Sequence, residues 1–462
     1  MRPVHIWVLL AVAFLHGCAT QFPQEQKTND LTQNLSSYHQ LIETSKTNHV
    51  KEDNENPNGI LSLENAVSLA LLQNPALSIY PFEIRAQEAL ALQSGLLPNP
   101  EIETEFEDFA GSGNFGFGDR IEVTSLYSQL IERGEKREKR YQLGMWETEM
   151  ARWDYRIAKI NVITLLAQRY LNVLAEQERV AILEELVQLS EKSLYAISER
   201  VRAGKISQLE ETRAKVEVAS ERNALDVARQ ELKSANSLLA MVWGATQPKF
   251  KKVSGKLESI QPLPELDELF KEAENNPDIL RWAVETKRRQ SVLELEQAQA
   301  VPDITLTGGL RYINESEDAS LVGAFSIPLN FFNRNQGAIR AAKERIEKAR
   351  LEQAAELIEL QAELSSSYQR SLGTQMEIER LQTEILPGAD QAYQSAREGY
   401  QLGKFNSLDV LDAQRTYFQA RVRYIESLTL FHQQWIRLER LIGKPLKDAV
   451  NLSNRSDKNE NK

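Results

Sequence analysis

The stretch Ala396–Gln414, AREGYQLGKFNSLDVLDAQ, decides the fold because it contains the end signal of one helix and the start signal of another. Gly403 supplies the left-handed backbone conformation that favours a helix C-terminus, and Asn406 is a favourable N-cap residue. We therefore predict a helix that ends at Gly403, a tight turn, and a second helix that begins near Asn406.

The residues after this turn predict a long helix that packs against a partner. Apolar residues recur at every seventh position: Val410, Tyr417, Tyr424, Phe431 and Leu438. A second seam contains Leu428, Trp435 and Ile442. A sustained period of 3.5 residues indicates supercoiled helices. The stretch is therefore interpreted as the tip of a long antiparallel helical hairpin.

The chain contains two copies of one plan. Landmarks recur in the same order at offsets near 200 residues: Asn74-Pro75 and Asn276-Pro277, Pro100 and Pro302, and Gly204-Lys205 and Gly403-Lys404. Such spacing predicts a duplicated unit and not a short solenoid module. We place the first repeat at 61–248, a linker at 249–265, the second repeat at 266–446 and a polar tail at 447–462.

Each repeat is predicted to contain a β-hairpin followed by a helical hairpin. The first has strands at about 101–109 and 120–129 and helices at about 133–203 and 207–243. The second has strands at about 303–312 and 320–329 and helices at about 336–402 and 406–442. A helix from Gly134 to Gly204 would extend about 105 Å, a length that suits a tube. Pro387-Gly388 is expected to break or kink the second long helix.

The predicted strands alternate with a period of two. Glu101, Glu103, Glu105 and Glu107 alternate with apolar residues and Thr104. Runs of this length with one apolar face fit tilted transmembrane strands, although a soluble half-buried sheet has the same periodicity. Because four strands cannot close a barrel, several chains would have to share one. The glutamates would then face its lumen, where they favour cations or form a generic polar lining.

The tip stretch resembles a known family. Gly-Tyr-x-x-Gly followed by Asp-Val-Leu-Asp-Ala is similar to the periplasmic tip of TolC-family outer membrane factors. The segment 128–137, SQLIERGEKR, is similar to that family's exit from its first β-hairpin. The segment 326–337, SIPLNFFNRNQG, resembles CzcC-like members, which serve heavy-metal efflux pumps of the resistance-nodulation-division type.

This resemblance implies a fold that is mostly α with a small β part. Three chains would form a homotrimer with a 12-strand outer membrane β-barrel, continuous with a long periplasmic α-helical barrel. It implies outer membrane lipid, a periplasmic adaptor (membrane fusion) protein and an inner-membrane pump as partners. The hairpin-tip turns would contact the adaptor through Gly204, Lys205, Gly403 and Lys404.

The resemblance also implies a gate at the tip. Asp409 and Asp412 would ring the periplasmic constriction, and Tyr400 would bond across neighbouring helices to hold it closed. The alternative is that Asn406 and Asp409 form a cap pair, while Asp412 is a solvated residue near a helix N-terminus.

The N-terminus predicts export. Residues 1–17 have the pattern of a signal peptide that is too short to span a bilayer. Cys18, the only cysteine, follows a lipobox-like Leu15-His16-Gly17, so we predict that it is lipidated. The remainder of 18–60 is a polar tether, too poor in apolar residues to offset its ordering entropy.

The composition excludes several other classes of protein. The net charge of −11 argues against nucleic acid as a partner. No catalytic set, cofactor motif or metal-ligand spacing is present, so we predict neither an enzyme nor a metal site. Two alternatives remain: a TolC-like duct for drug efflux or type I secretion, and a periplasmic coiled-coil scaffold.

Overall fold

The computed structural model describes residues 59–113, 118, 120–257 and 260–445. The predicted signal peptide at 1–17, Cys18 and the tail at 447–462 therefore lie outside the described residues. Within the described part the chain is mostly α-helical, with one four-stranded sheet and one pair of very short strands.

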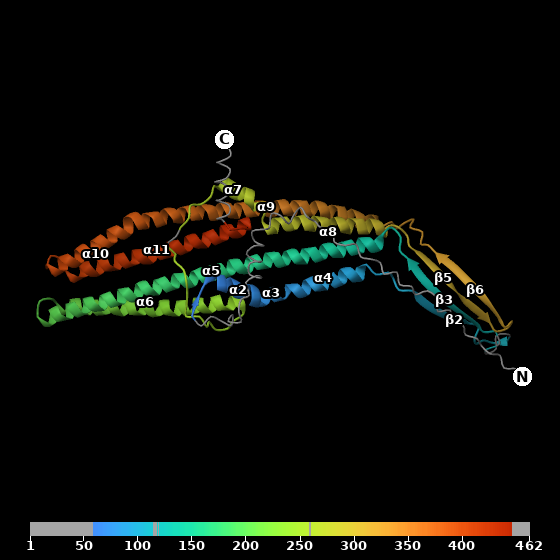
Figure 1. Ribbon diagram of the computed structural model, residues 1–462, viewed down its shortest axis with the longest axis horizontal. Helices are drawn as coiled ribbons and strands as arrows, with labels where there is room; N and C mark the ends of the chain where they lie inside the picture. Colours follow the sequence, from blue (N-terminus) through green and yellow to red (C-terminus); the bar gives the residue numbers. More distant parts are fainter. Residues whose placement is uncertain (1–58, 114–117, 119, 258–259, 446–462) are drawn as a thin grey trace. The chain divides into compact units, whose positions relative to one another are not determined.

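Two helical hairpins dominate the fold (Figure 1). The first consists of α5 (Lys136–Arg202) and α6 (Gln208–Ala240). The second consists of α9 (Gln336–Arg380), a π-helical turn (Leu381–Ile385) and α10 (Leu386–Gln401), followed by the returning α11 (Ser407–Ile442). At 1.5 Å per residue the 67 residues of α5 extend about 100 Å.

Pro387 does not end the second long helix, but the α-helical pattern is interrupted just before it. The residues before it form the π-helical turn Leu381–Ile385, and α10 continues directly from Leu386. Pro387 occupies one of the first positions of α10, where a missing N–H costs least. The wider turn accommodates the lost i→i−4 hydrogen bond without ending the helix.

The two Asn-Pro pairs have the same structural role in each repeat. Asn74 caps α3 (Pro75–Ser78), and its side-chain amide donates to the carbonyl of Val242, 2.6 Å away. Asn276 caps α8 (Pro277–Gln299) and donates to the carbonyls of Arg440 and Leu441. Asn74 therefore joins the start of α3 to Val242, just after α6, and Asn276 joins the start of α8 to the end of α11.

A glycine completes each junction. Gly244 and Gly443 end the returning segments with φ of 79° and 74°. A Cβ on Gly244 would lie 3.0 Å from Pro75 Cγ, and one on Gly443 would lie 2.6 Å from Pro277 Cδ. The glycines thus permit both the left-handed backbone and the close approach of the prolines.

Shorter elements complete each repeat. They are α2 (Leu63–Gln73) and α4 (Tyr80–Ser94) in the first repeat, and α7 (Leu266–Ala273) in the second. A 3₁₀ turn (Met241–Trp243) follows α6, and β1 (Ile60–Leu61) pairs in parallel with β4 (Lys252–Val253). The largest cluster of buried apolar residues lies here and includes Leu61, Leu166, Leu239, Leu428 and Phe431.

The sheet has the order β2-β3-β5-β6, with antiparallel pairing throughout. Its strands are β2 (Glu101–Glu107), β3 (Glu122–Ile131), β5 (Ile304–Ile313) and β6 (Asp318–Ser326). The first strand stops before the predicted 109 because Asp108 has a φ of 51°. The last stops before the predicted 329, where Pro328 has no N–H to donate. Among the described helices, none is both long and apolar enough to cross a membrane.

Candidate functional site

The tips of the two helical hairpins have the same turn geometry. Gly204 and Gly403 adopt φ of 66° and 71°. The backbone N–H of Lys205 donates to the carbonyl of Arg200, and that of Lys404 donates to the carbonyl of Gly399. These are helix-terminating turns in which glycine takes the left-handed position. The lysines and glycines of both turns are exposed.

The second tip requires a glycine at position 399 because of a contact that the sequence did not predict. The side chain of Phe405 folds back against the helix at this position, and a Cβ on residue 399 would overlap its ring. The backbone N–H of Phe405 also donates to the carbonyl of Gly399. The first glycine of the Gly-Tyr-x-x-Gly motif therefore makes space for the aromatic residue of the turn.

Tyr400 contacts the other hairpin through its ring. The Arg200 guanidinium of α5 lies 4.2 Å from the centre of the Tyr400 ring, which is a cation–π geometry. The hydroxyl of Tyr400 is buried and has no hydrogen-bond partner in the described part of this chain. The sequence pointed to Tyr400 but missed Arg200, because the contact joins residues two hundred positions apart.

A second contact joins the tips of the two repeats. Ser407, at the start of α11, donates to Glu210 Oε2 in the first turn of α6 at 2.6 Å. Within one chain, the two hairpins are therefore linked near their tips by Arg200–Tyr400 and by Ser407–Glu210.

The two aspartates of the predicted gate have different surroundings. Asp409 forms a capping box with Asn406: each side chain accepts from the other residue's backbone N–H at 3.0 Å. Asp412 is exposed and forms an ion pair with Arg415 at 2.7 Å. Asp412 also lines a groove of about 370 Å³ between α6 and α11. Asp409 thus has a local structural role, whereas Asp412 remains on the surface of this chain.

A buried polar cluster, the Ser190–Glu221–Gln414 node, lies where three helices meet. Gln414 of α11 donates to Ser190 Oγ of α5 at 2.5 Å, and Ser190 bonds to Glu221 of α6. Burial raises the pKa of Glu221 to about 7, and Glu217 adds to the rise while Ser190 opposes it. One oxygen each of Glu221 and Gln414 has no hydrogen-bond partner in the described part of the chain.

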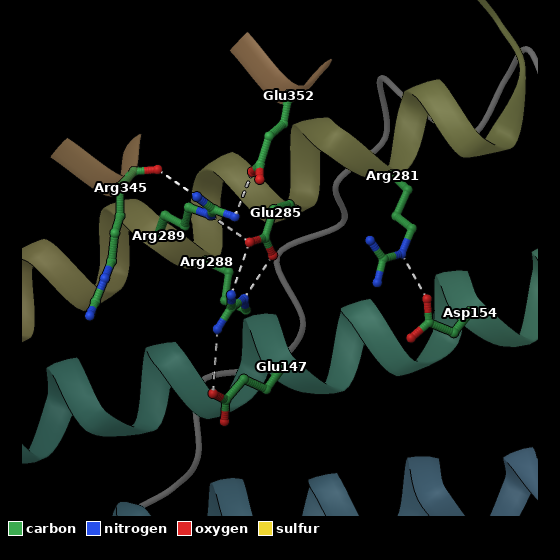
Figure 2. Close-up of polar contacts among 8 residues, drawn as sticks. All are labelled: Glu147, Asp154, Arg281, Glu285, Arg288, Arg289, Arg345 and Glu352. Carbon is green, nitrogen blue, oxygen red and sulfur yellow. Dashed lines mark hydrogen bonds and ion pairs between the residues drawn. The ribbon is translucent and has the colours of Figure 1, made fainter. Parts of the chain in front are cut away.

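An ion-pair network centred on Glu285 holds α8 between α5 and α9 (Figure 2). Glu285 is 6% exposed and accepts hydrogen bonds from Arg288 and Arg289. Arg289 also bonds to Glu352 of α9. Burial alone would raise the pKa of Glu285, but the two arginines outweigh it and lower that pKa. The network fixes α8, the helix from which the chain enters β5.

The four strands form one acidic and one apolar face. Cross-strand partners share a face, so the register shows which residues lie on each face of the sheet. The acidic face carries the predicted lining residues Glu101, Glu103, Glu105 and Glu107. The opposite face carries exposed large side chains: Ile102, Phe106, Tyr127, Ile131, Leu306, Leu310, Tyr312, Leu321 and Phe325. Among the residues that the structure describes, no group of three or more His, Cys, Asp or Glu has the geometry of a metal site.

Comparisons with known proteins agree with this arrangement. A family profile described as Outer membrane efflux protein matches residues 66–245 and 270–444. The chain is 34% identical over 388 residues to the cobalt-zinc-cadmium resistance protein CzcC of Cupriavidus metallidurans, covering 84% of this chain and 91% of that protein. It is 24% identical to the nickel-cobalt-cadmium resistance protein NccC of Alcaligenes xylosoxydans xylosoxydans, covering 61% and 63%. A crystal structure of CusC superimposes with a TM-score of 0.68 at 18% identity, covering 83% of this chain and 92% of CusC.

Proposed function

Since the chain belongs to the outer membrane efflux protein family, we propose that it is the outer membrane duct of a tripartite system that exports divalent heavy-metal cations. Members of this family are passive channels of the outer membrane with a periplasmic extension. The chain is therefore a channel subunit and not an enzyme.

The identity to CzcC is the observation that carries the choice of substrate. It extends over 84% of the chain, and the name of that protein refers to cobalt, zinc and cadmium. The acidic face of the sheet is consistent with cation transport. In a trimer, Glu101, Glu103, Glu105 and Glu107 would contribute twelve carboxylates to one lining, which favours cations without binding them at a defined site.

The sheet supports a shared barrel of three chains and twelve strands. The outer edges of its strands β2 and β6 pair with no other strand that the structure describes. A free strand edge in lipid leaves backbone groups without hydrogen bonds, so β6 of one chain would pair with β2 of the next. The apolar face would then contact outer membrane lipid, and the acidic face would line the lumen.

The remaining partners meet the chain at the hairpin tips. A periplasmic adaptor (membrane fusion) protein would contact the exposed turns of both repeats at Gly204, Lys205, Gly403 and Lys404. The adaptor would connect the duct to an inner-membrane pump of the resistance-nodulation-division type. Lipidation of Cys18 would add an anchor, and its test is palmitate labelling that disappears in Cys18→Ser.

We assign the gate to Tyr400, Asp409 and Asp412. Three copies of Asp412 on the axis would form a ring that attracts cations. Asp412→Asn should lower cation selectivity in planar bilayers, whereas Asp412→Glu, which keeps the charge, should not. Asp409 is less informative to test because its replacement also removes the capping box. Unchanged selectivity in Asp412→Asn would assign that residue to the solvated surface.

Deletion of the gene tests the substrate. The deletion should sensitise cells to cobalt, zinc or cadmium more than to drugs or detergents, and the wild-type gene should restore resistance. Sensitivity to drugs or detergents alone would favour a drug-efflux duct. A defect confined to an exported protein would favour type I secretion.

A further inference from the structure

The four strands of the sheet, β2, β3, β5 and β6, contain a single basic residue, Arg311 of β5. Arg311 pairs with Thr124 in the β3–β5 register, and Thr124 pairs with Glu105. Arg311 therefore lies on the acidic face. The other charged residues on this face are Glu101, Glu103, Glu105, Glu107, Glu122 and Asp318.

The Arg311 guanidinium lies between two of these carboxylates. Its Nη1 is 3.4 Å from Glu122 Oε2, and its Nη2 is 3.7 Å from Glu107 Oε2. Its Nε donates to Thr124 Oγ1 at 3.0 Å, and Thr124 is only 2% exposed. The arginine is thus held in place by a buried hydroxyl as well as by the two charges.

Without this arginine, the carboxylates of Glu107 and Glu122 would face each other with no positive charge between them. They are direct partners in the β2–β3 register, and like charges in that position repel. Two opposed carboxylates are also the oxygen ligands with which proteins hold hard divalent cations. The guanidinium therefore occupies a position in which a divalent cation would otherwise find two ligands.

The pair that Arg311 bridges lies at one end of the face. Glu107 is the last residue of β2 and Glu122 the first of β3, so both adjoin the loop farthest along the strands from the helices. Toward the helical end, Glu101, Glu103 and Glu105 form no ion pair with any residue that the structure describes. The carboxylates of the acidic face are thus unpaired at the helical end and partly compensated by Arg311 at the loop end.

We propose that Arg311 is a built-in counter-cation that keeps divalent cations from being retained at the outer end of the pore. The inference rests on the proposed function, because it requires the acidic face to line the pore. The unpaired carboxylates would attract cations into the pore. Arg311 would prevent Glu107 and Glu122 from chelating them at the exit.

Titration calorimetry with CoCl₂ on the purified oligomer in detergent tests the ion-binding step. Arg311→Gln should bind Co²⁺ about tenfold more tightly than the wild type, a change of about 1.4 kcal/mol. Arg311→Gln with Glu122→Gln should lose that gain, and Arg311→Lys should retain wild-type behaviour. Arg120→Gln is the matched control, because it breaks an ion pair with Glu315 in the loops and leaves Glu107 and Glu122 paired. Equal affinity of Arg311→Gln and wild type would overturn the proposal.

Planar bilayers test the same residue in the conducting pore. The charged helices cannot cross lipid, so the loops face the chamber opposite to the one that received protein. Co²⁺ added on the loop side should block Arg311→Gln at about one-tenth of the wild-type concentration, as the tighter binding predicts. Glu103→Gln with Glu105→Gln tests the lining separately. If Glu103→Gln with Glu105→Gln loses cation selectivity while block of Arg311→Gln is unchanged, the role proposed for Arg311 is rejected. The acidic face would then still line the pore. No change in any variant would reject the lining as well.

Assembly offers a further readout if Arg311→Gln forms few oligomers. Co²⁺ should restore its assembly by bridging Glu107 and Glu122, and it should not affect the triple variant in which all three residues are Gln. Failure of Co²⁺ to restore assembly would count against the proposal.

Discussion

At the residue scale, individual side chains from the two repeats link the hairpins near their tips. Arg200 and Tyr400 are the clearest case, because the aromatic ring and the guanidinium come from different hairpins. A half-buried cation–π contact contributes about 0.5–2 kcal/mol, which corresponds to about a two- to thirtyfold change in an equilibrium between closed and open tips.

Loss of this contact should favour the open tip. Arg200→Gln should raise the mean conductance in planar bilayers, because the ring then loses its charged partner. Tyr400→Phe keeps the ring and removes only a hydroxyl that has no partner in the described part of the chain, so it separates the ring contact from any bond that the hydroxyl makes to another copy. The reverse pattern, with a large effect of Tyr400→Phe and none of Arg200→Gln, would show that the hydroxyl bonds to another copy.

At the scale of elements, the sequence predicted the helix ends and starts that depend on local signals. Gly403 and Asn406 marked a helix end and a helix start, and the structure has a left-handed glycine and a capping box there. The effect of Pro387 could not be predicted, because a proline is compatible with either a broken helix or a π-helical turn. The sequence located the Asn-Pro pairs but not their partners, which lie 164 to 168 positions away.

The candidate site follows the same rule. Alternation along β2 was sufficient to place its four glutamates on one face, because a strand has a period of two. The positions of Arg311 and of the Ser190–Glu221–Gln414 node depend on register and on helix packing between distant segments. A single sequence carries no local signal for such contacts.

The Ser190–Glu221–Gln414 node should make stability depend on pH. The raised pKa of Glu221, about 7 against an ordinary value of 4.5, means that the folded protein binds a proton more readily than the unfolded chain. Stability should therefore fall as the pH rises through this interval, by about 3 kcal/mol per chain once Glu221 is ionised. Glu221→Gln should remove this loss.

Thermal unfolding followed by circular dichroism provides the measurement. Glu221→Gln should unfold at a higher temperature than wild type at about pH 8 and at a similar temperature at about pH 4.5. Asp226→Asn, an exposed carboxylate on the same helix, is the matched control and should leave the pH dependence unchanged. A wild-type pH dependence that persists in Glu221→Gln would show that other groups cause it.

At the scale of the whole molecule, the sheet of the single chain exposes its edges and one apolar face. Among the described residues, neither edge of the sheet is paired, and one of its faces carries nine exposed large apolar or aromatic side chains. Lipid can cover the face, but it cannot satisfy the backbone groups of an edge strand. The proposed closure of the barrel through β2 and β6 of neighbouring chains would satisfy these backbone groups, while lipid covers the apolar face.

Native mass spectrometry in detergent should accordingly detect three chains per particle and little monomer. Val322→Pro, in the middle of edge strand β6, should shift the distribution toward monomer, because proline removes an N–H from the ladder. Ile327→Pro, one residue beyond the end of β6, is the matched control and should leave the trimer intact. A wild-type monomer that stays soluble with its full strand content would contradict the shared barrel, since it would show that the free edges of one chain tolerate detergent. The unpaired backbone of the edge strands thus favours assembly, and the same experiment decides whether the acidic face has a lumen to line.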